Sequence, residues 1–140
     1  MAKTLFYRLF GVGRIPAAVM AELQQEGILL VDEGVRGSAT YRNFRKPGRA
    51  DSWRRQWYTA SIALTNIRLL ALWGSNPIIN APLADERLRS MRYSLEDKAA
   101  VLCVAFDAAL FHADWSGTIE YRFRTPQAQH LLELIQQRIG

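Results

Sequence analysis

The segment from Ala60 to Trp73 constrains the fold more than any other part of this 140-residue chain. It contains two apolar runs, rich in β-branched, aromatic and leucine residues, that are separated by the polar pair Thr65-Asn66. This pattern is typical of two antiparallel strands joined by a tight turn, in which Asn66 tolerates the positive φ that such turns often need. We therefore predict a β-hairpin with strands at residues 57–64 and 67–73.

Further strand candidates lie on both sides of the hairpin and predict a mainly β domain. The clearest is residues 119–123, where Ile119, Tyr121 and Phe123 alternate with polar residues. The other candidates are residues 28–31, 78–83, 88–95 and 100–106, and Pro82 makes 78–83 an edge or short strand. Residues 35–46 are either an extended ribbon or a long loop, and Pro47-Gly48 marks a turn.

The C-terminal residues predict an amphipathic helix that must lie against the sheet. Thr125 is suited to the N-cap and Pro126 to the first helical position. The apolar positions then recur at helical spacing as one stripe, formed by Ala128, Leu131, Leu132, Ile135 and Ile139.

Residues 1–26 are predicted to form a helical arm outside the β domain of residues 27–140. Gly11-Val12-Gly13 interrupts this arm, Pro16 suits the first turn of its second helix, and Gly27 suits the C-terminal cap of that helix. The first half places four large apolar residues on one helical face, which either packs on the protein or contacts a membrane surface: Leu5, Phe6, Leu9 and Phe10.

Length and composition exclude several classes of protein. At 140 residues the chain is expected to form one domain, and its single Cys103 rules out an intramolecular disulfide. We expect Cys103 to pack as a small apolar residue. No apolar run approaches the roughly 18 residues of a membrane span, and no secretory signal is recognised, so we expect a cytoplasmic protein, with peripheral contact to the inner face of the membrane as an option.

The positive charge is concentrated in one segment. The chain has a net charge of +5, yet the residues from Arg36 to Arg55 alone include seven basic side chains and one acid, Asp51. Such a segment either attracts anionic partners or is an ordinary solvated loop. Six of its basic residues are our candidate phosphate contacts: Arg42, Arg45, Lys46, Arg49, Arg54 and Arg55.

The hairpin also carries a resemblance to a known family. The run Ile62-Ala63-Leu64-Thr65-Asn66-Ile67-Arg68-Leu69-Leu70 resembles the Leu-Thr-[Asn/Asp]-x-Arg-Leu hairpin of bacterial PH-like and GRAM-type domains. The order of the later strands and of the C-terminal helix also matches, so that the resemblance covers residues 27–139. It implies a split β-barrel of two nearly orthogonal antiparallel sheets, capped by the C-terminal α-helix. Within it, we expect Arg68 to be structural.

The sequence predicts binding rather than catalysis. The pair His112 and Asp114 lacks a third metal ligand, and His130 with Glu133 is most simply an exposed local pair. No nucleophile motif or phosphate-binding glycine loop is present. We therefore expect no enzymatic activity, no metal site and no cofactor.

Three kinds of partner fit the basic segment. The first is an anionic membrane surface or a phosphorylated ligand, because in lipid-binding PH domains the loop at this position carries the basic residues. However, the segment departs from the phosphoinositide pattern, since no Lys/Arg-x-Arg triplet closes it. The second is a protein partner or a further copy of the chain. The third is nucleic acid, because aromatic residues interleave with the arginines at Tyr41, Phe44, Trp53, Trp57 and Tyr58.

Overall fold

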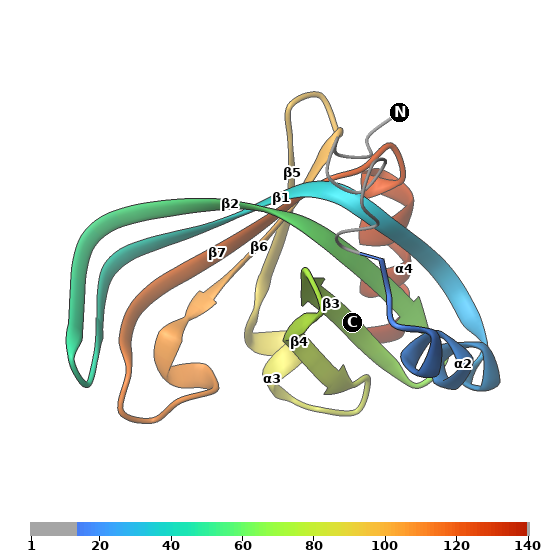
Figure 1. The fold of residues 1–140 in the computed structure, drawn as a ribbon, viewed down its shortest axis with the longest axis horizontal. Coiled ribbons are helices and arrows are strands. Elements are labelled where there is room, and N and C mark those ends of the chain that lie inside the picture. The colour runs from blue at the N-terminus through green and yellow to red at the C-terminus, as the bar shows by residue number, and fades with distance from the viewer. Residues whose placement is uncertain (1–13, 140) are drawn as a thin grey trace.

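The computed structural model of the protein describes residues 14–139, and it confirms a mainly β fold. Helix α2 (Ala17–Glu26) is followed by the strands β1 (Ile28–Lys46), β2 (Arg49–Thr65), β3 (Arg68–Trp73) and β4 (Asn76–Pro82). The short helix α3 (Arg87–Ser90) leads into β5 (Arg92–Glu96) and β6 (Val101–Asp107). The 3₁₀ turn η1 (Ala108–Leu110), β7 (Ser116–Arg124) and helix α4 (Ala128–Ile139) complete the described chain (Figure 1).

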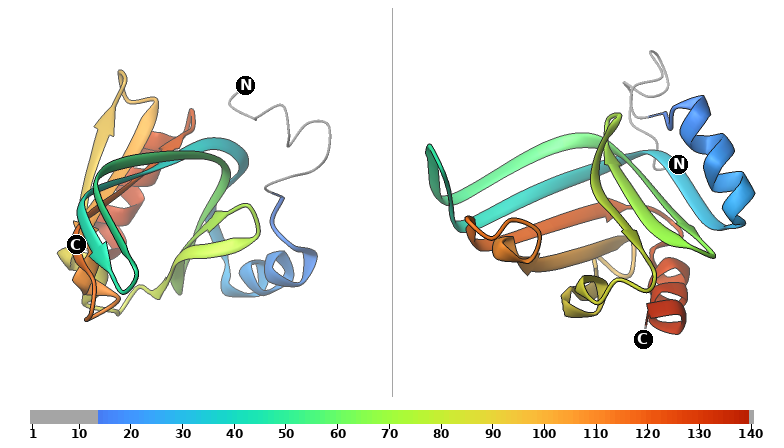
Figure 2. Two further views of the ribbon diagram at one scale, coloured as in Figure 1. Left: turned by 60° about the vertical axis from the view of Figure 1, so that its left-hand side comes forward. Right: turned by 90° about the horizontal axis from the view of Figure 1, so that it is seen from below.

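The seven strands form one antiparallel sheet in the order β4-β3-β2-β1-β7-β6-β5. Instead of the two separate sheets that we expected, hydrogen bonds connect all seven strands, because the long β1 pairs with β2 on one side and with β7 on the other. The sheet bends strongly along β1 and β2, so that its inner face encloses the core (Figure 2). Its outermost strands, β4 and β5, do not pair with each other, and the sheet is not closed.

The predicted hairpin is present, but a different group holds its turn. Asn66 is not among the described non-glycine residues with positive φ. Instead, the Thr65 hydroxyl accepts hydrogen bonds from the backbone N–H groups of Ile67 at 3.1 Å and Arg68 at 3.0 Å. The N–H of Asn66 donates to the carbonyl oxygen of Gly27 at 3.0 Å. The side chain of Thr65 thus stabilises the turn, a role that we predicted for Asn66.

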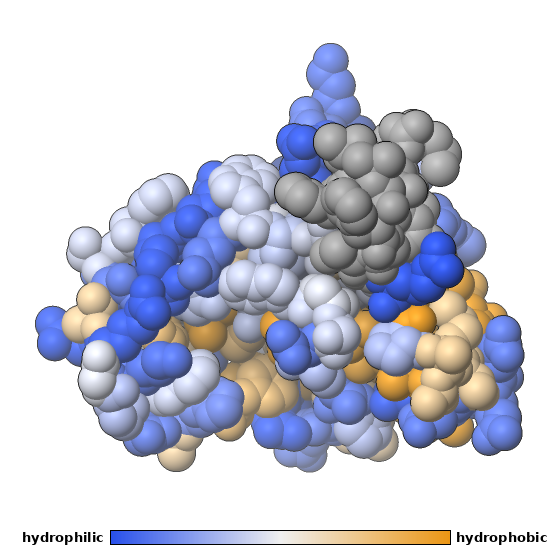
Figure 3. Space-filling view, viewed as in Figure 1, coloured by the Kyte–Doolittle hydropathy of each residue, from blue (hydrophilic) through white to orange (hydrophobic). Residues whose placement is uncertain are grey.

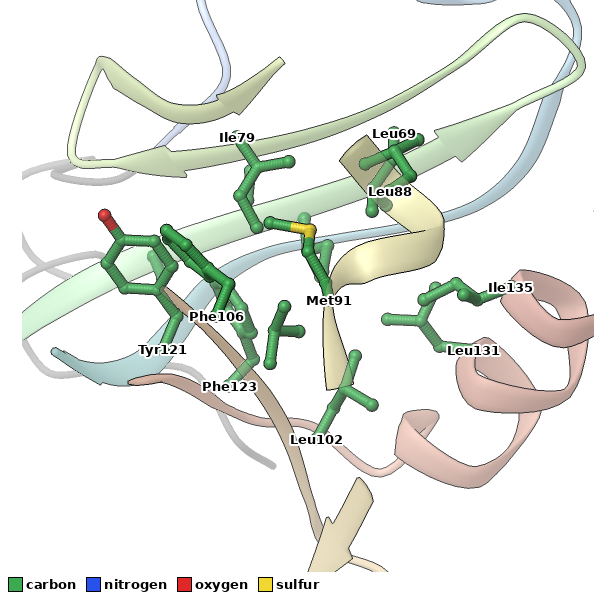
Figure 4. Packing of buried hydrophobic residues seen from close by; sticks show 14 of the residues in the cluster. Leu69, Ile79, Leu88, Met91, Leu102, Phe106, Tyr121, Phe123, Leu131 and Ile135 are labelled. Atoms are coloured by element: carbon green, nitrogen blue, oxygen red, sulfur yellow. The ribbon is translucent and has the colours of Figure 1, made fainter. Parts of the chain in front are cut away.

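Helix α4 closes the inner side of the sheet and completes the core. Its buried residues are Ala128, Leu131, Ile135 and Ile139, which confirms most of the predicted stripe. Figure 4 shows Leu131 and Ile135 pointing toward Met91 and Leu102. The Thr125 hydroxyl accepts a hydrogen bond from the N–H of Gln127 at 3.1 Å, and the helix itself begins three residues after Thr125.

Helix α2 lies on the opposite, outer face of the sheet (Figure 2). Its fully buried Leu23 packs with Ile15 against three residues of β2 and β3, namely Ala63, Leu70 and Leu72. Gly27 ends this helix with a φ of 87°, as predicted. The outer face is therefore covered near the Thr65 turn.

Two predicted segments differ from the structure. Residues 88–90 of the candidate strand 88–95 belong to α3, and β5 begins only at Arg92. The Asp85 carboxylate accepts a hydrogen bond from the N–H of Arg87 at 2.9 Å, which favours a helical turn there. The segment 35–46, which the sequence left open, is part of β1 and thus an extended ribbon.

Candidate functional site

The six basic residues predicted to contact phosphate do not form one site. Arg42 and Arg55 belong to the outer face, where Arg42 pairs with Glu120 of β7 and Nε of Arg55 donates to Thr40 of β1 at 2.8 Å. The Arg54 guanidinium lies 4.2 Å from the ring centre of Tyr41, which packs against the core. Arg54 and Arg55, although neighbours in the sequence, therefore lie on opposite faces of the sheet, because side chains alternate along a strand.

The other predicted residues lie near the Pro47-Gly48 turn. Lys46 stands over the ring of Trp115 at 5.1 Å, and Arg45 is exposed. Asp51 pairs with Arg49 at 2.9 Å and with Arg54 at 3.1 Å, and the hydrogen bond from Arg49 lowers the pKa of the Asp51 carboxyl. These basic side chains therefore contact local partners or lie apart along the hairpin, and they do not converge on one site.

A second group of arginines converges on the outer face in the middle of the sheet. Ser38 of β1 stands opposite Trp57 of β2 and Arg122 of β7 in the strand register. Two residues away along β1, Arg36 stands opposite Arg124. Because side chains alternate between the two faces of a strand, these residues share one face. Figure 3 shows a band of strongly hydrophilic side chains farther along the β1–β2 ribbon, on its left-hand curve.

These residues surround a cleft of about 290 Å³. Four arginines and two carboxylates line it, so its charge is positive. The lining residues are Arg36, Gly37, Ser38, Arg55, Trp57, Glu96, Asp97, Val101, Arg122 and Arg124, and we call this the outer-face cleft.

The floor of the outer-face cleft contains an unsatisfied polar atom. Ser38 is only 1% exposed, and its Oγ has no hydrogen-bond partner among the described residues. It is the one buried side-chain nitrogen or oxygen atom in residues 14–139 that lacks a hydrogen-bond partner. Leaving a buried hydroxyl unpaired costs about 1–3 kcal/mol.

Arg122 is fixed by ion pairs and hydrogen bonds across three strands. Its Nε lies 2.9 Å from Glu96 Oε1, one Nη lies 2.8 Å from Glu120 Oε1, and the other lies 3.3 Å from Thr40 Oγ1. The hydrogen bond to Glu96 raises the pKa of Arg122 and lowers the pKa of Glu96. Arg124 is held at 2.6 Å by Asp97. Both guanidinium groups are therefore positioned before any ligand arrives.

By contrast, the positive charges of Arg36 and Arg55 are not balanced by an acidic partner among the described residues. Within residues 14–139, neither is paired with a carboxylate. Their excess charge and the unpaired Ser38 hydroxyl lie at the same cleft. This combination can donate hydrogen bonds to an oxyanion.

Two tryptophans extend the cleft along β2. Trp53 is 56% exposed and Trp57 is 64% exposed, whereas the only other exposed large hydrophobic residue in the described chain is Ile67. The Arg55 guanidinium lies between them, 5.4 Å from the Trp53 ring centre and 5.9 Å from that of Trp57. Exposing large aromatic side chains to water costs free energy, so this arrangement indicates a contact surface.

The sequence predicted only part of this site. It identified Arg55 as a contact and Trp53 and Trp57 as aromatic neighbours, but it missed Ser38, Arg122 and Arg124. The alternation of Arg122 and Arg124 with Tyr121 and Phe123 would have placed both arginines on the polar face of β7. Nothing in the sequence indicated that β7 pairs with β1.

Other candidates from the sequence give no second site. Leu5, Phe6, Leu9 and Phe10 lie outside the described residues. His112 stacks on Trp115 with 3.7 Å between ring centres, and no cluster of three potential metal ligands occurs in the part of the chain described by the structure. None of the described helices has the length and apolarity needed to cross a membrane.

Comparison with known proteins adds no family to this description. No family model matches the chain, and no curated protein matches it. The function therefore has to be inferred from the geometry and charge of the site.

Proposed function

We propose that this protein is a non-enzymatic, PH-like binding module that holds a phosphate-bearing ligand in the outer-face cleft. The PH-like assignment rests on the Thr65-Asn66 hairpin motif. The strongly bent antiparallel sheet and the terminal helix packed against its inner side support it. Within residues 14–139, α2 covers the outer face near the Thr65 turn, and none of its residues lines the cleft.

The unpaired Ser38 hydroxyl at the base of a cleft with four arginines carries the proposal. A phosphate oxygen would accept the Ser38 O–H, while Arg36 and Arg55 would donate from the sides. Arginine suits this role because its planar group can contact two oxygens at once. Arg122 and Arg124 are already held by carboxylates at the cleft, which lowers the cost of ordering the site.

The phosphate can come from a soluble ligand or from a lipid headgroup, since both present the same chemistry. We would measure binding of inorganic pyrophosphate by calorimetry. Cosedimentation would be measured with vesicles of phosphatidylcholine alone, with added phosphatidylserine, and with added phosphatidylinositol phosphates. Binding of pyrophosphate would indicate a soluble ligand, and binding only to the anionic vesicles would indicate a membrane.

Three variants test where binding occurs. We expect Arg36→Gln and Ser38→Ala to weaken binding strongly. Arg49→Gln is the matched control, because it removes the same charge near the Pro47-Gly48 turn, and it should bind like the native protein. Loss of binding in Arg49→Gln together with native binding by Arg36→Gln would contradict the proposal and place the contact at the hairpin.

Self-association through β5 is the second candidate, favoured by the pattern of this edge strand. Arg92, Ser94 and Glu96 are exposed and alternate with Tyr93 and Leu95. Two copies paired antiparallel about Ser94 would place Arg92 opposite Glu96 of the other copy in both directions. Unpaired edge strands readily accept such a partner.

A charge reversal tests this candidate. If β5 pairs with itself, Arg92→Glu should convert a dimer to a monomer in light scattering, because like charges would then meet. The double variant Arg92→Glu/Glu96→Arg should restore the dimer. A monomeric native protein over the accessible concentration range would rule this candidate out.

A further inference from the structure

Trp53 and Trp57 suggest which phosphate-bearing ligand the outer-face cleft takes. They occupy positions i and i+4 of β2, so both project from the same face with Arg55 between them. Four residues of extended strand separate their Cα atoms by roughly 13 Å. Trp57 lines the cleft directly, whereas Trp53 lies farther along the strand, toward the Pro47-Gly48 turn.

Neither indole is used to stabilise the fold. Both rings are more than half exposed and neither belongs to the hydrophobic core, whose aromatic members include Phe44, Tyr58 and Phe123. Their one described ring contact is with Arg55. An exposed indole beside a cation presents a flat surface for a planar group and leaves a positive charge for an adjacent anion.

We propose that the ligand is a single-stranded nucleic acid, with bases stacked on Trp57 and Trp53 and a backbone phosphate beside Ser38. This inference rests on the proposed function, because the same cleft holds the phosphate. The indoles stand much farther apart than stacked neighbouring bases, which are about 3.4 Å apart. The strand must therefore be splayed, with its backbone crossing Arg55 between the two stacked bases.

The surroundings of the indoles favour a nucleic acid over a membrane. Insertion into a lipid interface needs a continuous apolar surface. On this face the indoles have polar neighbours, since Ser38 stands opposite Trp57 and Arg42 stands opposite Trp53. The third exposed hydrophobic residue, Ile67, lies just beyond the far end of β2.

The test uses fluorescein-labelled oligopyrimidine probes, as single-stranded DNA, single-stranded RNA and the corresponding DNA duplex, with binding followed by anisotropy. We expect both single strands to bind more tightly than the duplex. Trp57→Ala and Trp53→Ala should each weaken binding by roughly tenfold, and the conservative Trp57→Phe should retain most of it. Ile67→Ala, which shortens an exposed apolar residue elsewhere, is the matched control and should bind normally.

The salt dependence gives a second readout. Arg36→Gln and Arg55→Gln should each reduce the slope of log affinity against log salt by about 0.7 on single strands, because each removes a phosphate contact. The tryptophan variants should lower affinity and leave this slope unchanged. Far-UV circular dichroism would verify that each variant keeps the native fold.

Each outcome is decisive for the inference. Equal binding of the oligonucleotides by the native protein and by Trp53→Ala/Trp57→Ala would overturn it, as would a preference for the duplex. Binding of pyrophosphate or anionic vesicles without any binding of oligonucleotides would overturn this inference and leave the proposed function standing. Absence of binding to every probe would overturn both.

Discussion

Arg68 shows how a single side chain can join three elements of the fold. Its Nε lies 3.1 Å from Glu26 and one Nη lies 3.2 Å from Glu22, both on α2, while the other Nη donates to Asn80 of β4 at 3.1 Å. Glu26 also accepts a hydrogen bond from Thr65 at 2.8 Å. Arg68, the arginine of the hairpin motif, therefore holds α2 against the hairpin, as expected for a structural residue.

Replacing Arg68 by Gln should lower the free energy of unfolding by about 1.5–3 kcal/mol, because hydrogen bonds to charged groups are lost from a side chain that is largely shielded from solvent. Urea denaturation would measure this change. Arg87→Gln serves as the control, since its pair with Asp85 is exposed on the arginine side and exposed ion pairs add little stability. Equal effects of the two substitutions would show that the Arg68 network has no special role.

Cys103 is buried, but it lies outside the main core cluster on the inner face of the sheet. Its neighbours Leu102 and Val104 point into the core cluster, while Cys103 stands on the outer face of β6 opposite Arg122. Burial raises the pKa of its thiol, which reduces the thiolate fraction at neutral pH. We therefore expect slow reaction with a thiol-reactive dye in the native protein and fast reaction in urea, measured by absorbance. Equal rates in the two states would contradict this prediction.

Glu96, which lines the outer-face cleft, makes the stability of the protein depend on pH. The hydrogen bond from Arg122 lowers the pKa of Glu96 in the folded protein. A carboxyl whose pKa is lowered by folding adds stability above its unfolded pKa, and that stability disappears as the pH falls through the folded value. Carboxyl NMR titration should show a Glu96 pKa below the ordinary range, and Arg122→Gln should move it upward. An unchanged pKa in Arg122→Gln would exclude Arg122 as the cause.

At the level of elements, the pairing of β1 with β7 depends on a close approach of two backbones. The register shifts between Arg42 and Arg45, where Asn43 has a φ of 50°. Opposite this bulge, Gly117 has a φ of 94°, and a Cβ atom there would lie 2.4 Å from the carbonyl oxygen of Asn43. Glycine is needed at this position because both the φ and the contact exclude a side chain.

Gly117→Ala should therefore destabilise the protein more than Gly48→Ala. Gly48 also has a positive φ, at 81°, but a Cβ atom there would meet nothing within 4 Å. The cost at Gly48 should be about 1–2 kcal/mol from the backbone conformation alone, whereas Gly117→Ala adds a steric clash. Thermal or urea unfolding of the two variants would measure the difference. Similar losses would mean that the bulge can open to accept the methyl group.

At the level of the whole molecule, the sheet has a large core on its inner face and a small cluster under α2 on its outer face. No residue of α2 contributes to the inner core cluster. The β domain predicted from residue 27 onward should therefore keep its main core without the arm. Without α2, Ala63, Leu70 and Leu72 would lose their cover.

Deleting residues 1–26 should leave the β-type circular dichroism spectrum intact while lowering stability and increasing binding of a hydrophobic dye. Leu23→Ala in the full chain provides a milder version, with an expected loss of about 2–5 kcal/mol. The control is Gln24→Ala, an exposed position on the same helix. Loss of cooperative unfolding in the truncated protein would show that the arm is part of the folding unit.

Local patterns in the sequence were sufficient for most of the elements. The alternation at Ile119–Phe123 and the stripe from Ala128 to Ile139 predicted β7 and α4, because strand and helix periods depend only on near neighbours. The turn at Thr65-Asn66 followed in the same way. The α3 turn was missed because a single helical turn has too little periodicity to be recognised.

What the sequence alone determined is a mainly β domain with a helix at each end and an excess of positive charge in one segment. The tertiary structure decided which of those charges act together. Strand alternation places Arg54 and Arg55 on opposite faces of β2, and the pairing of β1 with β7 brings Arg122 and Arg124 beside Ser38, more than 80 positions earlier in the chain. Register between distant strands arises from packing and hydrogen bonds across the whole sheet, and no local pattern encodes it.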